Sequence, residues 1–571
     1  MQRYQGLPAS GGVAIGPAWV YRPEALQIER RRSDDPEQEW RRLELTLAQA
    51  RQQLDELEER ARDAVGEEEA AIFEAHRLFL DDVELLDMVG RTIRNDRLNA
   101  EAAVDDSFEH YAAMLLSLDN DYFRARAQDV RDVKQRVLRI LLGKETASAA
   151  ALDHPAVILA DDLTPSDTIQ FERSHILGLC TVRGGPTSHT AILARALGVP
   201  AVVSAPLALD EIAPGALVVL DGDAGEVIVE PSAEALAAAR ARQQRWETKR
   251  TAELASANEP AVTRDGHAVE VVANVGNRDD ALQAVEMGAE GVGLFRTEFL
   301  YLDRDDMPTE AEQVQAYRQV FELMPGRPLV VRTLDIGGDK PAAYLDVAPE
   351  ANPFLGWRAI RMMDRRPDVL AGQFRALLLA AGQTDADLRI MLPLVSRLEE
   401  IERARSLFEE ARAALAAEGQ PLPAAVQFGM MVEVPSAALL AQHFAQRVDF
   451  FSIGTNDLTQ YALAVDRTNE RVAQLASPFH PAVLKLIAMT LEAAHARGKW
   501  VGLCGEFAGD PLATPLLLGL GLDEFSMAPV AIPAVKQEIR RWSMTRCREI
   551  ARDVLALPTT QAVRRYLQEQ S

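Results

Sequence analysis

The sequence predicts a multidomain α/β protein, in which an α/β domain with an inserted all-α block of helical hairpins precedes a (β/α)8 barrel. Three observations lead to this prediction. Residues 34–146 show the apolar spacing of helices, residues 155–230 contain short apolar runs typical of buried strands, and eight such runs alternate with helical segments after residue 261. At about 150 residues per domain, a chain of 571 residues requires several cores.

Composition limits the partners and the compartment. The chain has 61 Lys and Arg against 86 Asp and Glu, a net charge of −25, which repels nucleic-acid backbones but suits a basic protein partner. Its cysteines, Cys180, Cys504 and Cys547, show neither a disulfide framework nor zinc-ligand spacing. Because we find no basic leader and no apolar run of ~20 residues, we expect a cytoplasmic protein without a membrane span.

The first strands need partners from a distant part of the chain. Residues 7–21 are rich in glycine and carry short apolar runs, which predict one or two strands. The helical segment that follows them offers no strand to pair with. We therefore expect residues 1–33 and 147–231 to form one domain, into which residues 34–146 are inserted.

The inserted segment predicts antiparallel helical hairpins. Pro36 can open the first helix, whose apolar stripe consists of Leu43, Leu45, Leu47, Leu54 and Leu57. Turn-forming residues at 66, 90, 95 and 119–120 divide the segment into further helices.

The hairpin tip at residues 66–84 is strongly acidic and carries interleaved aromatic residues. One interpretation is a solvated acidic face over a packed apolar face. The other is a docking surface for a basic protein, with aromatic anchors. The candidate docking residues are Glu67, Glu68, Phe73, His76 and Glu84.

Residues 184–195, Gly-Gly-Pro-Thr-Ser-His-Thr-Ala-Ile-Leu-Ala-Arg, place His189 where a glycine-rich turn meets a helix. Free N–H groups at a helix start favour an anion, and a neutral imidazole is a nucleophile. His189 is therefore a candidate phosphoryl carrier, although an ordinary capping or core histidine is the alternative. Thr168, at another expected helix start, is a candidate hydrogen-bond partner for His189.

A long polar helix at 232–260 is expected to link this half to the barrel, residues 261–571. In such a barrel, chemistry belongs at the C-terminal ends of the strands. The strands that we expect are 269–275, 291–295, 328–332, 389–395, 427–433, 448–453, 499–504 and 523–528.

Charged residues gather at these strand ends. Converging guanidiniums require an anionic ligand, and the carboxylates of Glu433 and Asp457 on adjacent strands suit Mg²⁺, although they can also be salt-bridge partners of the arginines. Cys504 is a candidate acid or nucleophile, against the alternative of an inert buried thiol. The candidate ligand residues are Arg296, Arg332, Arg358, Asn456, Asp457 and Arg467.

Two motifs resemble signatures of a known family. Residues 184–195 resemble the phosphohistidine signature of the phosphoenolpyruvate-utilising enzymes, and residues 449–460, Asp-Phe-Phe-Ser-Ile-Gly-Thr-Asn-Asp-Leu-Thr-Gln, resemble their second signature. The helical block, Ile72-Phe-Glu-Ala-His76 and the chain length resemble the enzyme I family of the bacterial phosphotransferase system.

The resemblance implies roles for these residues. Phosphoenolpyruvate would bind at the barrel rim to Arg296, Arg332, Asn456, Asp457 and Arg467, near Arg358, with Mg²⁺ on Glu433 and Asp457. His189 would take the phosphoryl group through Nε2, and Cys504 would protonate the enolate to give pyruvate. The phosphoryl group would pass to a histidine of the carrier HPr, docked on the helical block, and the barrel would form a homodimer that serves sugar transport.

Three alternatives differ in features that the sequence displays. A dikinase or phosphoenolpyruvate synthase would carry a large ATP-binding domain, and no Walker-type motif is found. A regulatory sensor of phosphoenolpyruvate would have lost His189, Cys504 or the arginines. The nitrogen-regulatory relative usually bears an additional N-terminal sensor domain, so we expect the sugar-transport form.

Overall fold

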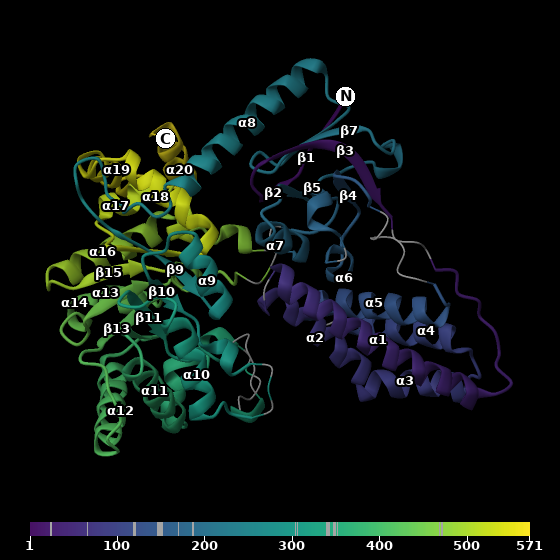
Figure 1. Ribbon diagram of the computed structural model, residues 1–571, viewed down its shortest axis with the longest axis horizontal. Coiled ribbons are helices and arrows are strands. Elements are labelled where there is room, and N and C mark those ends of the chain that lie inside the picture. Colours follow the sequence, from purple (N-terminus) through teal and green to yellow (C-terminus); the bar gives the residue numbers. More distant parts are fainter. Residues whose placement is uncertain are drawn as a thin grey trace. The chain divides into compact units, whose positions relative to one another are not determined.

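A computed structural model gives the fold, which divides into two compact units, residues 1–249 and 250–571 (Figure 1). It describes all residues except 23–25, 66, 118–120, 145–151, 170, 186–187, 303, 305, 338–342, 346–349, 351, 468, 470–471 and 571. The side chains of residues 62–65, 67–71, 117, 121–125, 189, 196 and 343 are also outside the description.

The first unit contains an eight-stranded sheet in the order β1-β8-β7-β3-β4-β5-β6-β2. Strand β3 is antiparallel to β7 and parallel to β4, so the N-terminal strands do pair with residues 155–230. The strands are β1 (Gln2–Gln5), β2 (Leu7–Ser10), β3 (Val13–Tyr21), β4 (Ala156–Ala160), β5 (Ile176–Thr181), β6 (Ala201–Val203), β7 (Leu217–Asp221) and β8 (Glu226–Val229). Helices α6 (Pro165–Thr168), α7 (His189–Ala196) and α8 (Ala233–Ala255) lie within or after this region.

Five helices are inserted between β3 and β4. They pack around a core of their own that includes Leu43, Leu47, Leu54 and Leu57. Leu45, which we expected in the same stripe, is 76% exposed because its place in the helical repeat turns it away from that core. The helices are α1 (Pro36–Val65), α2 (Glu67–Asp81), α3 (Val83–Arg94), α4 (Ala100–Ser117) and α5 (Asp121–Leu141).

The second unit is a closed barrel of eight parallel strands, which confirms the predicted (β/α)8 architecture. The first strand pairs with both the second and the last, so the sheet has no free edge. The strands are β9 (Glu270–Val275), β10 (Val292–Phe295), β11 (Pro328–Arg332), β12 (Asp387–Leu392), β13 (Gln427–Val432), β14 (Phe450–Ile453), β15 (Trp500–Leu503) and β16 (Glu524–Met527).

Helices surround this barrel and bury its outer apolar side (Figure 1). Strand residues alternate between this outer core and a separate cluster that includes Leu294, Val330, Met391, Met431 and Phe450. The helices are α9 (Arg278–Glu286), α10 (Glu310–Phe321), α11 (Pro367–Gly382), α12 (Leu398–Ala417), α13 (Pro435–Leu439), α14 (Ala441–Phe444), α15 (Thr455–Leu463), α16 (Pro481–His495), α17 (Thr514–Leu520), α18 (Ile532–Arg541), α19 (Met544–Leu555) and α20 (Thr560–Gln570).

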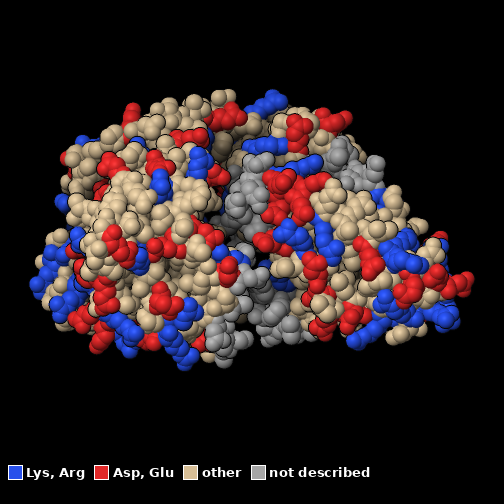
Figure 2. Space-filling view, turned by 60° about the horizontal axis from the view of Figure 1, so that its bottom comes forward, with Lys and Arg blue, Asp and Glu red and all other residues tan. Residues whose placement is uncertain are grey.

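The surface carries both charge signs despite the net charge of −25. Figure 2 shows acidic and basic side chains interspersed over the face in view, without a broad continuous basic field among the described residues. Within the described part of the chain, no helix is both long and apolar enough to cross a membrane.

Candidate functional site

Charged side chains gather at one end of the barrel because parallel strands bring their carboxyl ends to a common rim. Arg332 is the last residue of β11, and Glu433 directly follows β13. Asp457 lies in the first turn of α15, just after β14, and Cys504 directly follows β15. The strand order therefore assembles these groups from distant parts of the sequence.

Asp335 connects two buried arginines at this rim. Its Oδ1 and Oδ2 accept from Nε and Nη2 of Arg358, at 3.1 and 2.9 Å. Nη1 of Arg332 lies 3.5 Å from the same Oδ2 atom, and Nη2 of Arg332 lies 2.9 Å from Glu298 Oε1. A single carboxylate thus orients two guanidiniums, with Glu298 as a second support.

Burial affects the pKa of both arginines. Removal from water alone would lower the pKa of Arg332, but the neighbouring carboxylates of Glu298, Asp335 and Glu433 offset this effect and raise it above its ordinary value. The pKa of Arg358 is raised in the same way, with Asp335 as the main partner. Both groups are therefore permanent cations despite their burial.

Sequence reasoning named these arginines but assigned no role to Glu298 or Asp335. The available signal was their spacing, because Glu298 stands two residues after Arg296 and Asp335 three residues after Arg332. Carboxylates so close to strand-end arginines are natural supports for the guanidiniums. Only the fold shows that Asp335 also reaches Arg358, 23 residues further along the chain.

Glu433 and Asp457 form a buried carboxylate pair beside this network. Glu433 Oε1 accepts from the backbone N–H of Leu394 at 2.5 Å, and Leu394 holds an uncommon positive φ of 54°. Burial first, and then the charges of Asp457 and Asp335, raise the pKa of Glu433 well above its usual range. Asp457, the other carboxylate of the pair, has two cationic neighbours: Arg358 Nη1 and Arg467 Nη2 each lie 3.7 Å from its Oδ1 atom.

This pair fits a divalent cation. Among the described residues Asp457 Oδ1 is buried and makes no hydrogen bond, and the two guanidiniums lie too far away to supply one. The described residues contain no group of three or more His, Cys, Asp or Glu that could hold a metal by itself. Mg²⁺ often takes only one or two carboxylates and completes its shell with water and substrate oxygens.

The remaining rim residues are more exposed. Arg296 stacks on the ring of Phe299, with its guanidinium carbon 5.5 Å from the ring centroid. Asn456 is exposed, and the side chain of Arg467 is 34% exposed. Arg467 joins the buried network through Asp457, whereas Arg296 and Asn456 are placed at the rim by their strand ends.

Cys504 is a buried thiol of the barrel interior. Its Sγ lies 3.8 Å from the carbonyl oxygen of Ile453. Burial raises its pKa to about 12, although the nearby Ser452 hydroxyl and the charge of Arg332 act in the opposite direction. Such a thiol is protonated at neutral pH, which suits a proton donor better than a thiolate nucleophile.

His189 is the first residue of α7, directly after the glycine-rich turn. The N-cap is Ser188, whose Oγ accepts from the backbone N–H of Ala191, so His189 does not cap the helix. Gly184 has a φ of +94°, a conformation that favours glycine. The imidazole of His189, and the turn residues Pro186 and Thr187, lie outside the described residues.

Thr168 is buried, and its Oγ1 donates to the carbonyl of Thr164 at 2.9 Å. It closes the short helix α6, which contacts α7. The hydrogen bond between Thr168 and His189 stays a prediction, because one of its two side chains is not described.

The helical tip differs from the expected docking surface. Phe73 is 2% exposed and His76 is fully buried, with its Nε2 3.4 Å from Asp129 Oδ1. Both rings therefore belong to the helical core, because the period of α2 directs them inward, and neither presents a surface to a partner. Glu84 is exposed, and the side chains of Glu67 and Glu68 lie outside the described residues.

Sequence reasoning missed two exposed apolar residues at this tip. Leu78 is 67% exposed and Val83 is 76% exposed. Leu78 lies two residues from His76 on α2, so it points away from the face that the core covers. Exposed apolar side chains beside Glu84 are typical of a contact surface.

Comparisons with known proteins agree with this architecture. Family models match three parts of the chain: residues 5–126 match the N-terminal part of PEP-utilising enzymes, residues 152–225 their mobile domain, and residues 250–544 their PEP-binding domain. PEP is phosphoenolpyruvate. The similarity thus extends well beyond the two motifs.

Curated relatives are similar over almost their full length. A phosphoenolpyruvate-protein phosphotransferase of Geobacillus stearothermophilus is 45% identical over 98% of this chain and 96% of its own. The proteins of that name from Bacillus subtilis (strain 168) and Staphylococcus carnosus (strain TM300) are 44% and 42% identical. The first of these two matches covers 100% of both chains, and the second covers 98% of each.

The role of Asp335 predicts a large effect on stability. Replacing Asp335 by Ala leaves Arg358 without its bidentate partner in a buried site, which should lower the unfolding free energy of the barrel by about 3–5 kcal/mol. Urea unfolding of the full chain measures this loss.

The matched control is Asp368→Ala, which removes an exposed pair with Arg366 and should cost less than about 1 kcal/mol. Equal losses in the two variants would contradict a supporting role for Asp335.

Proposed function

The chain belongs to the family of PEP-utilising enzymes, and on this premise we propose that it transfers the phosphoryl group of phosphoenolpyruvate first to its own His189 and then to a carrier protein, HPr. Pyruvate is the other product. The observation that carries the proposal is the rim network, in which Asp335 holds Arg332 and Arg358 beside the carboxylate pair Glu433 and Asp457.

The charge balance of the rim supports a substrate that arrives with a cation. Among the described rim residues, four guanidiniums face four carboxyl groups; they are Arg296, Arg332, Arg358 and Arg467, and Glu298, Asp335, Glu433 and Asp457. Phosphoenolpyruvate carries a phosphate and a carboxylate, which match the planar fork of arginine. A divalent cation and this anion would offset much of each other's charge in a site that already holds groups of both signs.

Glu433 and Asp457 would hold Mg²⁺ together with oxygens of the substrate. When bound, Mg²⁺ supplies positive charge that neutralises the oxygens around the phosphorus. Arg332 and Arg358 would orient the substrate from their fixed positions, with Arg296, Asn456 and Arg467 as further contacts. Fixed charges of this kind need no rearrangement during the transfer.

His189 would attack the phosphorus through Nε2. The N–P bond forms as the bond between phosphorus and the enol oxygen breaks, and the electron pair stays with the enolate. The enolate carbon then takes the proton of Cys504 Sγ, which gives pyruvate and a thiolate. The raised pKa of Cys504 keeps that proton available at neutral pH.

The phosphoryl group would then move to a histidine of HPr, with the helical tip as the docking surface. Exposed Glu84 follows exposed Val83 in α3, and Leu78 is exposed on α2, a pattern that suits a basic partner with an apolar patch. Phe73 and His76 would hold this tip in place from within the helical core. Thr168 would orient the imidazole of His189. His189 must serve two partners in turn, so its domain would move between them.

We place the protein in the cytoplasm as a homodimer joined through the barrel. Leu439, Leu440 and Leu475 are 61, 41 and 59% exposed on the barrel unit and would gain from burial in such an interface. We favour the sugar branch of the phosphotransferase system over a nitrogen-regulatory role, and both over a synthase or dikinase.

Phosphoryl labelling tests this proposal. With Mg²⁺ and phosphoenolpyruvate labelled in its phosphate, the full chain should gain acid-labile label without ATP and pass it to added HPr. His189→Ala should abolish the labelling, and His154→Ala, which changes a histidine on an exposed bend, should not. Label that persists in the His189→Ala variant would contradict the proposed role of His189 as phosphoryl carrier.

The position of Cys504 predicts a defect in turnover with little change in binding. Cys504→Ala removes the proton donor and should lower kcat for pyruvate formation by roughly 10²–10⁴-fold, while the affinity for substrate changes little. Cys547→Ala removes a buried thiol in α19 and should leave kcat unchanged. Unchanged turnover in Cys504→Ala would remove this thiol as the donor.

The tip predicts a selective loss of carrier transfer. Reversal of Glu67, Glu68 and Glu84 to Lys should slow phosphoryl transfer to HPr at least tenfold and spare labelling of His189, because like charges would then meet. Reversal of Glu399, Glu409 and Glu410, exposed on α12, is the matched control. Equal losses of both reactions in the tip variant would mean that the tip is structural.

A further inference from the structure

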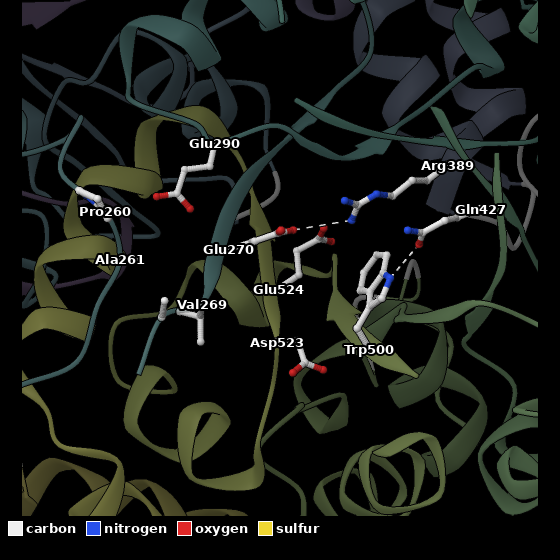
Figure 3. Close-up of a pocket in the computed structure, with 11 residues that line it drawn as sticks. Pro260, Ala261, Val269, Glu270, Glu290, Arg389, Gln427, Trp500, Asp523 and Glu524 are labelled. Atoms are coloured by element: carbon white, nitrogen blue, oxygen red, sulfur yellow. Dashed lines mark hydrogen bonds and ion pairs between the residues drawn. The ribbon is translucent and has the colours of Figure 1, made fainter. Parts of the chain in front are cut away.

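A cavity lies at the end of the barrel where the strands begin, opposite to the rim, and Figure 3 shows residues that line it. It has a volume of about 610 Å³, within the range of small-molecule sites. Residues at or near the start of five strands line it: Glu270 of β9, Arg389 of β12, Gln427 of β13, Trp500 of β15 and Glu524 of β16. None of these residues belongs to the proposed catalytic machinery.

Glu524 lines this cavity and carries a buried carboxylate. Its side chain is 1% exposed, and among the described residues neither of its oxygens has a hydrogen-bond partner. A Cβ at Gly502 would lie 2.6 Å from Glu524 Oε1, so glycine on the neighbouring strand leaves the carboxylate its room. A buried carboxylate without a partner is costly unless a ligand or a proton neutralises it.

The other charged groups around the cavity have partners within the protein. Asp523 Oδ2 lies 2.8 Å from His495 Nε2 and accepts from the backbone N–H of Val501. Glu290 Oε1 lies 3.0 Å from the ammonium of Lys536.

Arg389 does not neutralise Glu524. Its Nη2 lies 2.9 Å from Asp387, its Nη1 lies 3.7 Å from Glu270, and its guanidinium stacks over Trp500 at 4.9 Å. Figure 3 shows the contact with Glu270 and the carboxylate of Glu524 beside it. One guanidinium therefore faces three carboxylates, and the cavity keeps an excess of negative charge.

We propose that this cavity binds a small organic cation, an aliphatic amine or guanidine whose charged group pairs with Glu524 and Glu270. The apolar part of such a ligand would contact Pro260, Ala261 and Val269, which line the same space. An organic cation fits better than a bare metal ion, because only an organic ligand could also use this apolar lining. The proposal does not depend on the phosphoryl-transfer function.

The protonation of Glu524 supplies a specific signature. Burial raises the pKa of Glu524 to about 8. The charges of Glu270 and Asp523 act in the same direction, and the charge of Arg389 acts against them. At pH 7 the free site is therefore mostly protonated, and a bound cation would ionise it. The proton leaves to solvent as the ion pair forms, so binding should be accompanied by net proton release.

Calorimetric titration of the full chain with putrescine and with agmatine tests the proposal. At pH 7, in two buffers of different ionisation enthalpy, at least one of these amines should bind with one equivalent and show net proton release. Glu524→Gln should weaken this binding at least tenfold and remove the proton release. Glu409→Gln, an exposed position on α12, should behave as the parent chain.

Three outcomes would overturn the proposal: neither amine binds saturably, binding is unchanged in Glu524→Gln, or Mg²⁺ competes for the same site as the amine. If Glu524→Gln does not fold, Glu270→Gln replaces it, with an expected loss of several-fold. Labelling of His189 is measured separately, so failure of the amine site leaves the phosphoryl-transfer assignment intact.

Discussion

The shared carboxylate of Asp335 is the interaction on which the site depends. Two guanidiniums converge on it from β11 and from the segment before α11, and both are nearly fully buried. Without an anion between them, Arg332 and Arg358 would repel each other in a region with little water to screen them. Asp335 therefore fixes the positive side of the rim before any substrate arrives, and the cost of ordering these side chains is met during folding.

The same network favours the binding of a cation. Asp335 adds negative charge near Glu433 and Asp457, and burial raises the pKa of Glu433 further. A divalent cation would stabilise the buried carboxylate pair. The rim arginines would stabilise the substrate anion in the same way. In the function that we propose, cation and anion would bind as partners, and the buried thiol of Cys504, whose pKa is raised, would supply the proton to the enolate.

The predictable part of this site followed from topology. Arg332, Glu433, Asp457 and Cys504 end or follow barrel strands in the sequence, and parallel strands have to bring those ends together. Contacts across distant loops, such as Asp335 with Arg358, carry no comparable signal. Helix faces were also ambiguous: Phe73 and His76 were expected at the surface and are buried, whereas Leu45 was expected in the core and is exposed. The apolar period predicts a face, but the packing partners decide which residues at its edge are covered.

Coordination of the substrate by a metal held on Glu433 and Asp457 is the central claim, and electron paramagnetic resonance of bound Mn²⁺ tests it most directly. Phosphoenolpyruvate labelled with ¹⁷O in its phosphate should broaden the Mn²⁺ lines in the parent chain, because a labelled oxygen bonded to the metal couples to its electrons. The variant Glu433→Gln/Asp457→Asn should lose the bound Mn²⁺ signal. Lines that stay narrow in the parent chain, or Mn²⁺ that binds the double variant equally well, would contradict the account.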